Sequence, residues 1–206
     1  MIKRLVFVTL VVGCFLVPIT GRASLQKGLF KFGFDSTLFR FGLVNYDPHG
    51  PDEKDFDNIS FGIGIPNGGL IFGYCVVNGL VLGARVSVGL QGYDDYIRDE
   101  QVVIWSAMPF LEYIFLRRVF RPFFMVTLGM EGVNAYRHDD TWWWAFKAAG
   151  GGGAHIFAHP RVSIDFTLLA GFAIGHGENV GLPNPGPKYE HWRFMAECLL
   201  GVSGWF

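Results

Sequence analysis

The sequence predicts an all-β fold in which antiparallel strands close into a transmembrane barrel of eight strands. Half of the 206 residues are hydrophobic and 17% are charged, whereas a typical soluble domain has about 25% charged residues. Apolar residues alternate with small or polar ones along much of the chain, which is the pattern of strands. After the first 23 residues, no segment has the roughly 18 uninterrupted apolar residues of a membrane helix. Strands are therefore the elements expected to cross the membrane.

The N-terminus has the features of a secretory signal peptide. Two basic residues precede an apolar run over 5–19, and small residues follow at Gly21 and Ala23. About 15 apolar residues are fewer than the roughly 20 that a membrane helix needs. We predict that residues 1–23 are a signal peptide and that residues 24–206 form the barrel domain.

A lipid anchor is an alternative for the same segment. The stretch "VVGC" ends at Cys14 and resembles a bacterial lipobox, in which the cysteine carries a lipid. The apolar run continues after Cys14, whereas lipoproteins usually become polar there. The sequence leaves the lipidation of Cys14 open.

The alternation assigns one face of each strand to lipid and the other to the barrel interior. In the segment 161–175, every second residue from Val162 to Ile174 is apolar, and the residues between them are mostly small, polar or charged. The predicted strands are 28–46, 57–77, 80–93, 101–116, 120–133, 142–157, 161–175 and 190–206. Charged residues share a face with Gly, Ser and Thr, which suits a crowded interior, while the Val, Leu, Ile and Phe faces suit lipid.

The connections between these strands alternate in length. Long, charged connections alternate with short turns, of which "NG" at 78–79 is a strong hairpin signal. Eight strands then place both chain termini at the end with the short turns. The apolar phase shifts at 35–37 and 66–69, and each shift indicates a bulge or an additional turn. Two additional turns would give ten strands, which is the alternative to eight.

Charged residues within the strands are the first candidate functional group. An eight-stranded barrel has an interior just wide enough to be filled by side chains. We therefore expect an internal charge network rather than an open pore, with Arg40, Arg121 or Arg161 balancing the excess of acids. The expected members are Arg85, Glu112, Glu131, Lys147, Asp165 and Glu197.

A run of four glycines precedes His155 in "AGGGGAHIF". The run lacks the Lys-Ser/Thr that follows the glycines of a phosphate-binding loop. Glycines within a strand instead indicate close packing or curvature. We expect His155 to be an interior residue and not a ligand.

The hairpins resemble those of small bacterial outer-membrane β-barrel proteins. The segments that carry this resemblance are "GYCVVNGLVLGARVSVG", "PFLEYIFLRRVFRPFFMVTLGMEG" and "GGGGAHIFAHPRVSIDFTLLAGFAIG", together with the terminal Phe206. The resemblance implies an outer-membrane location, contact with lipid and lipopolysaccharide, and an assembly signal at Phe206 that the barrel-assembly machinery recognises. The chain departs from the family pattern at Gly204, where an aromatic residue is common. Aromatic residues near other strand ends, including Trp142, Trp143, Trp144, Trp192 and Trp205, are expected to form interfacial girdles.

Removal of the signal leaves two cysteines, Cys75 and Cys198. In an eight-stranded barrel, the first strand separates the strands that carry them. Two inter-strand steps span about 9–10 Å, which exceeds the Cα separation of about 7 Å that a disulfide can bridge. We predict two free thiols.

The connection "HGENVGLPNPGPKYE" resembles the active-site stretch of outer-membrane lipid A deacylases. His176, Asn179, Gly181 and Glu190 occur in matching order, but Glu178 stands where that family has its serine nucleophile. No serine occurs between Ser163 and Ser203, so a triad would lack its attacking atom. We retain His176 and Glu190 as weak candidates for a lipid-modifying site.

The remaining expectations concern ligands and role. Loose binding of divalent cations is an alternative for His49, His138, His176, Asp47, Asp139 and Asp140, although their spacing defines no metal site. The net charge of −1 does not support nucleic-acid binding. We expect a monomeric, porin-like barrel without cofactor or enzymatic activity, and with a structural or surface-interaction role. The alternatives are a lipid-modifying enzyme and a narrow channel for small solutes.

Overall fold

The computed structural model describes residues 25–48, 56–63, 68–95, 98–115, 119–136, 141–179 and 188–206. The predicted signal peptide and Cys14 lie outside these residues. None of the described residues belongs to a helix that is long and apolar enough to cross a membrane. The described strands are β1 (Phe30–Pro48), β2 (Phe56–Ile63), β3 (Gly68–Val77), β4 (Leu80–Asp95), β5 (Arg98–Ile114), β6 (Phe120–Tyr136), β7 (Thr141–His159), β8 (Val162–Asn179) and β9 (Lys188–Trp205).

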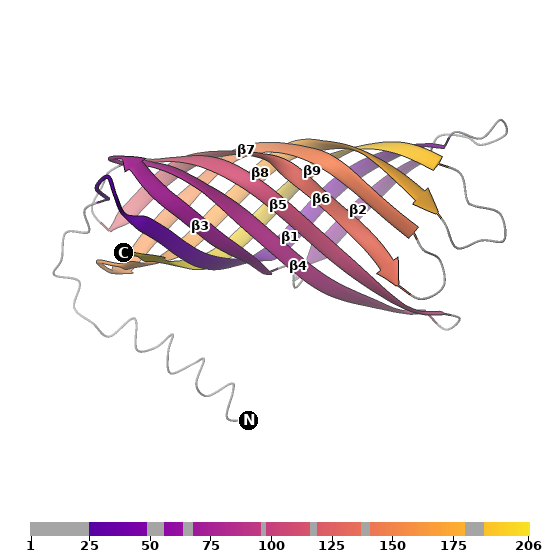
Figure 1. Ribbon diagram of the computed structural model, residues 1–206, viewed down its shortest axis with the longest axis horizontal. Helices are drawn as coiled ribbons and strands as arrows, with labels where there is room; N and C mark the ends of the chain where they lie inside the picture. Colours follow the sequence, from indigo (N-terminus) through magenta and orange to yellow (C-terminus); the bar gives the residue numbers. More distant parts are fainter. Residues whose placement is uncertain are drawn as a thin grey trace, which may run out of the picture.

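The strands form a closed antiparallel barrel with eight strand positions (Figure 1). Along one edge, β1 pairs with β9, which closes the barrel. Along its other edge, β1 pairs with β2 through residues 39–46 and with β3 through residues 30–36. Because β2 and β3 follow each other along the same edge of β1, they occupy one position. The prediction of eight strands is therefore confirmed, and the alternative of ten is wrong.

A β-bulge explains the first shift in apolar phase. The pairing of β1 with β9 shifts register between Thr37 and Phe39, so Leu38 is the additional residue. Lys31 and Asp35 point inward before the bulge, and inward positions are even-numbered after it. The second shift, at 66–69, coincides with the boundary between β2 and β3, and residues 64–67 lie outside the described part of the chain.

One end of the barrel carries the short turns, and we call it the short-turn end. The turn between β3 and β4 contains Asn78 and Gly79, and Gly79 has a φ of 80°, which a type I′ hairpin turn requires. The start of β1 and the C-terminus lie at this end (Figure 1). The opposite end, with the longer connections, is the long-connection end.

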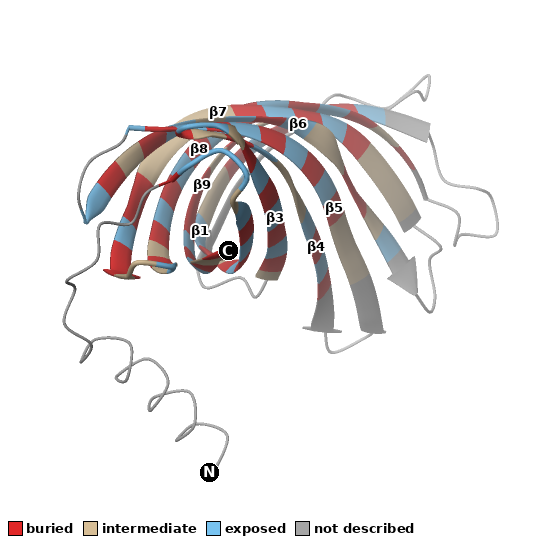
Figure 2. Ribbon diagram, turned by 60° about the vertical axis from the view of Figure 1, so that its left-hand side comes forward, coloured by how far each residue is buried: buried red, intermediate tan, exposed pale blue. Residues whose placement is uncertain are grey.

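The barrel has an apolar exterior and a polar interior. Along the strands, buried and exposed residues alternate where their side chains are described (Figure 2). Leu128 and Ile174 are more than 60% exposed, whereas Glu112 and Ser163 are completely buried. An exposed apolar band of this extent is the surface of a membrane protein. The inside-out distribution that the alternation predicts is confirmed.

The aromatic residues at the strand ends divide between the two faces. Trp192 and Phe206 are 49% and 65% exposed on the outside, and Trp142 and Trp144 lie on the same face of β7 as the exposed Phe146. Two others do not belong to a girdle, because Trp143 packs against interior residues and Trp205 is 2% exposed inside the barrel. The prediction for these two tryptophans is wrong.

Candidate functional site in the barrel interior

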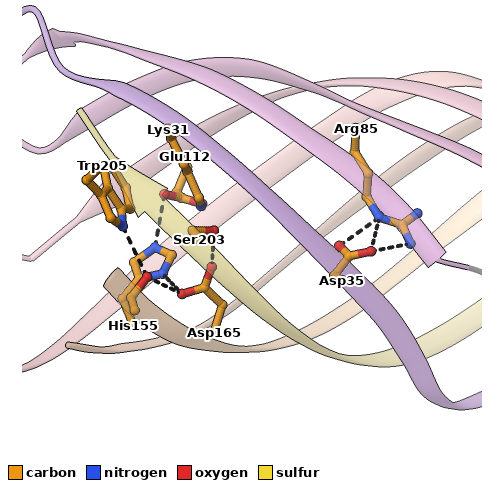
Figure 3. Close-up of polar contacts among 9 residues, drawn as sticks. Lys31, Asp35, Arg85, Glu112, His155, Asp165, Ser203 and Trp205 are labelled. Carbon is orange, nitrogen blue, oxygen red and sulfur yellow. Dashed lines mark hydrogen bonds and ion pairs between the residues drawn. The ribbon is translucent and has the colours of Figure 1, made fainter. Parts of the chain in front are cut away.

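An inner ionic layer crosses the barrel near the short-turn end. Lys31 Nζ in β1 lies 2.7 Å from Glu112 Oε2 in β5. His155 in β7 lies between two carboxylates, with Nε2 at 3.1 Å from Glu112 Oε1 and Nδ1 at 2.7 Å from Asp165 Oδ1. Figure 3 shows these side chains meeting inside the barrel. The inner ionic layer, formed by these four residues, therefore joins β1, β5, β7 and β8.

Hydroxyl groups complete the hydrogen bonding of Asp165. Ser163 Oγ donates to Asp165 Oδ1 at 2.6 Å, and Ser203 Oγ donates to Asp165 Oδ2. Trp205 Nε1 in turn donates to Ser163 Oγ at 3.1 Å. A neutral imidazole donates through one nitrogen only. If His155 donates to both carboxylates, one additional proton must therefore be on its ring.

An arginine–aspartate pair lies farther along β1. Arg85 Nε is 2.9 Å from Asp35 Oδ1 and 2.8 Å from Oδ2 (Figure 3). A second guanidinium nitrogen of Arg85 lies 2.8 Å from Asp35 Oδ1. Nε therefore donates to both carboxylate oxygens, and hydrogen bonds between charged groups are stronger than those between neutral ones. The pair connects β1 with β4, across the position that β3 occupies.

An outer ionic layer lies toward the long-connection end. Glu197 in β9 accepts from Lys147 Nζ at 2.7 Å and pairs with Arg40 at 2.5 Å. Glu131 in β6 pairs with Arg193 and lies 3.7 Å from Lys147. These five residues form the outer ionic layer, which joins β1, β6, β7 and β9. The Arg193 guanidinium also lies 4.8 Å from the ring centroid of Trp143.

All six charged residues of the expected network face the interior, in three groups. Glu112 and Asp165 belong to the inner ionic layer, Arg85 pairs with Asp35, and Glu131, Lys147 and Glu197 belong to the outer ionic layer. The expectation that an arginine would join them applies to Arg40. Arg121 faces inward with its guanidinium 4.5 Å from the Phe157 ring centroid, and Arg161 is exposed in the turn before β8.

Sequence reasoning missed three members, Lys31, Asp35 and Arg193, and it also missed the bridging role of His155. The bulge at Leu38 obscured the inward face of β1, so Lys31 and Asp35 were not assigned to it. A signal was present for Arg193, because it is four residues from Glu197 and therefore on the same strand face. His155 was expected inside, but its two partners come from other strands.

A small cavity lies between the two ionic layers. Its volume is about 40 Å³, and its lining includes Asp35, Arg85, Thr127, His155 and Glu197. At roughly 10–15 Å³ for each water, this is space for about three waters. A cavity of this size has no room for a sugar or a nucleotide.

The weak lipid-modifying candidates lie away from this interior. His176 and Glu190 are paired neighbours on β8 and β9 near the long-connection end, and the Trp142 ring lies 6.0 Å from the His176 ring. The other register partner of His176 is Trp144. No serine is paired with His176 in the described strands, so the structure brings the histidine and the acid together without a serine nucleophile.

The candidate cation ligands cannot be assembled from the described residues. His49, His138, Asp139 and Asp140 lie outside the described part of the chain, as does Gly181 of the deacylase-like stretch. Within the described ranges, no group of three or more His, Cys, Asp or Glu side chains is placed to hold a metal ion.

Comparisons with known proteins show the fold. No protein-family model matches the chain, and no curated protein matches it in sequence. The outer membrane protein OprG from Pseudomonas aeruginosa is similar in structure, with a TM-score of 0.56 and 10% identity over 90% of this chain and 99% of OprG. The outer membrane protein AlkL, solved in DMPC lipid bilayers, is similar with a TM-score of 0.53 and 14% identity over 92% of this chain and 95% of AlkL. The chain therefore has the fold of small bacterial outer-membrane barrels.

Proposed function

We propose that this protein is an integral outer-membrane barrel whose interior is closed by its own side chains, and that it has a structural or surface-interaction role without enzymatic activity. The observation that carries the proposal is the pair of ionic layers that cross the barrel interior. The similarity of fold to OprG and AlkL supports the location.

The exterior supports insertion in a bilayer. Its apolar side chains would contact lipid tails, and Trp142, Trp144 and Trp192 would lie at the level of lipopolysaccharide headgroups at the long-connection end. The exposed Phe206, which ends the strand that closes the barrel, would be read by the barrel-assembly machinery. No oligomeric contact is needed to close the barrel, which supports a monomer.

The ionic layers support a closed interior for an energetic reason. Lys31 and Glu112 are at most 3% exposed, and breaking a buried ion pair by removing one partner costs about 3–5 kcal/mol. A solute crossing the barrel would have to separate such pairs in both layers. The water-sized cavity between them provides no continuous route for a larger molecule.

The interaction surface would then be the long-connection end. With the interior filled, the groups available to a partner are those of the connections and of the outward rim. Most of the 18 acidic residues of the chain lie in the long connections or in the strand ends that border them, including those at 52, 53, 55, 139 and 140. We therefore assign the surface role to that end.

Solute uptake tests the closed interior. Proteoliposomes containing the folded protein are diluted into an isotonic solution of a small sugar, and swelling is followed by light scattering. The expected swelling rate equals that of protein-free liposomes. Swelling that grows with the amount of wild-type protein would contradict the closed interior and favour the narrow-channel alternative.

A lipid-modifying enzyme is the second candidate, because His176 and Glu190 are register partners. Mass spectrometry of lipid A from cells with and without the protein distinguishes the two. The proposal expects identical lipid A in both. A mass change that is lost in His176→Ala would overturn the non-enzymatic role.

A further inference from the structure

The N-terminal residues of the described chain turn across the short-turn end of the barrel. Gly28 N donates to Cys75 O at 2.9 Å, and Cys75 N donates to Leu29 O at 2.8 Å. Lys27 N donates to Asn78 Oδ1 at 3.1 Å. Gly28 has a φ of 98°, which allows the chain to reverse here. We call the segment Leu25–Leu29 the strap.

Leu25 enters the mouth of the barrel. Its side chain is 3% exposed, although it lies before the first strand, where chain ends are usually solvated. It packs in an apolar cluster that forms a floor below the inner ionic layer. The other buried members of the cluster come from six strands, and they are Ile71, Cys75, Val81, Phe110, Ile114, Phe123, Phe157 and Trp205.

The floor is complete only when β9 is in place. Trp205, from the end of β9, is 2% exposed and packs against Phe157 with ring centroids 6.0 Å apart. At the same point, the chain closes through two backbone hydrogen bonds, Phe30 N to Phe206 O and Phe206 N to Phe30 O. The strap leads directly into Phe30. The hydrogen bonds that close the barrel therefore also hold the residue that follows the strap.

We propose that the strap is a seal for the short-turn mouth, and that it seats only after β9 has closed the barrel and supplied Trp205. An open β1–β9 edge leaves Leu25 without one wall of its socket and leaves the floor exposed to water. The seated strap therefore marks a completed barrel. This seal is additional to the ionic layers, and it does not depend on the absence of enzymatic activity or on the surface role.

Cys75 is a reporter for the strap. Its side chain is completely buried beneath the strap, and its thiol donates to Val77 O at 3.0 Å. Cys198 points to the opposite face of the barrel wall, because it is even-numbered on β9, where inward positions are odd-numbered. In a Cys198→Ala background, labelling by a charged maleimide therefore measures access to Cys75 alone.

The test compares labelling rates of the full mature chain, folded in detergent micelles. Leu25→Asp is expected to label at least tenfold faster than the parent, Leu25→Ala at an intermediate rate, and Trp205→Ala as fast as Leu25→Asp. Lys27→Ala is the matched control, because its backbone, not its side chain, makes the strap contact, and it should label at the parent rate. The folded fraction is measured in each sample by the gel-mobility difference between unheated and heated protein, and rates are compared for the folded band.

Three results would overturn the proposal. The first is a parent that labels as fast as urea-unfolded chain. The second is an unchanged rate in both Leu25 variants. The third is a Trp205→Ala variant that labels at the parent rate, which would show that the closing strand does not seat the strap. Leu25→Ala introduces no charge into the apolar floor. It therefore provides a labelling rate for Cys75 even if Leu25→Asp does not fold.

Discussion

Lys31 and Glu112 form an ion pair across the barrel interior, with 2.7 Å between Nζ and Oε2. The ammonium group also lies 5.2 Å from the ring centroid of Trp205. Both residues are almost inaccessible to water, so each depends on the other for compensation of its charge. The pair joins strands on different sides of the barrel and is part of the inner ionic layer.

The two single substitutions of this pair should together cost more stability than the double substitution does. We expect Lys31→Met and Glu112→Gln each to lower the free energy of unfolding by about 3–5 kcal/mol, because each leaves an uncompensated buried group. The double variant should lose less than the two combined, with a coupling of about 0.5–3 kcal/mol. Urea unfolding in lipid vesicles measures these values. Arg161→Met, on the exposed turn, is the control, and additive losses would contradict the pairing.

His155 should be essential to the inner ionic layer. His155→Ala removes the group between Glu112 and Asp165 and leaves two buried carboxylates facing a void, so we expect a loss of about 3–5 kcal/mol. His159 is the matched control, because it is the last residue of β7, four positions away, and its ring accepts a hydrogen bond from the backbone N of Arg161 in the exposed turn. His159→Ala should change stability by about 0.5 kcal/mol or less. Equal urea midpoints for the two variants would rule out the bridging role.

Within the glycine run, substitution by alanine should be tolerated at Gly150 but should destabilise the barrel at Gly151 and Gly153. A Cβ at Gly151 would lie 1.9 Å from Leu168 O, and a Cβ at Gly153 would lie 1.9 Å from Phe166 O. At Gly150, the nearest atom would be at 3.8 Å. We expect Gly151→Ala and Gly153→Ala to cost about 1–3 kcal/mol through overpacking, whereas Gly150→Ala should be nearly neutral. Unfolding midpoints test this, and a costly Gly150→Ala with a tolerated Gly151→Ala would contradict the close approach of β7 and β8.

Both cysteines of the mature chain should be free. Cys75 and Cys198 are unpaired thiols in the structure, and β1 lies between β3 and β9 as the sequence predicted. Alkylation of the unfolded protein without reductant, followed by intact-mass measurement, should find two modified thiols in a chain that begins after the signal peptide. A chain with no modified thiol would show that the two cysteines are linked.

The overall fold could be predicted from the sequence because it depends on local alternation. In a barrel strand, every second residue faces lipid and the residues between them face the interior, as between Val162 and Ile174. The unpaired residue Leu38 broke this rule, since a single additional residue exchanges the two faces. The alternation across this residue therefore did not show that Lys31 and Asp35 face the interior.

The composition of the ionic layers could be predicted only in part. Alternation identifies which charges face inward, but it does not identify partners that meet across the interior. Glu112, His155 and Asp165 are on β5, β7 and β8, and Glu112 is not on a strand adjacent to the other two. The strap was missed for a similar reason, because Leu25 belongs to no strand and its socket is assembled from six.

Gly204 has a structural explanation that the sequence did not provide. A Cβ at this position would lie 2.7 Å from an atom of the Phe206 ring. The glycine therefore leaves space for the terminal aromatic ring on the outer surface. Glycine at this position is therefore compatible with the observed position of the Phe206 ring.

Single-molecule conductance tests the closed interior most directly. The purified wild-type barrel is inserted in a planar lipid bilayer between solutions of concentrated potassium chloride, and the current is recorded over a range of voltages. Insertion is verified independently by recovery of folded protein from the bilayer lipid. The two ionic layers predict a current equal to the protein-free baseline. Reproducible steps of constant size from the wild-type protein would show a continuous water path through the barrel and would contradict the account.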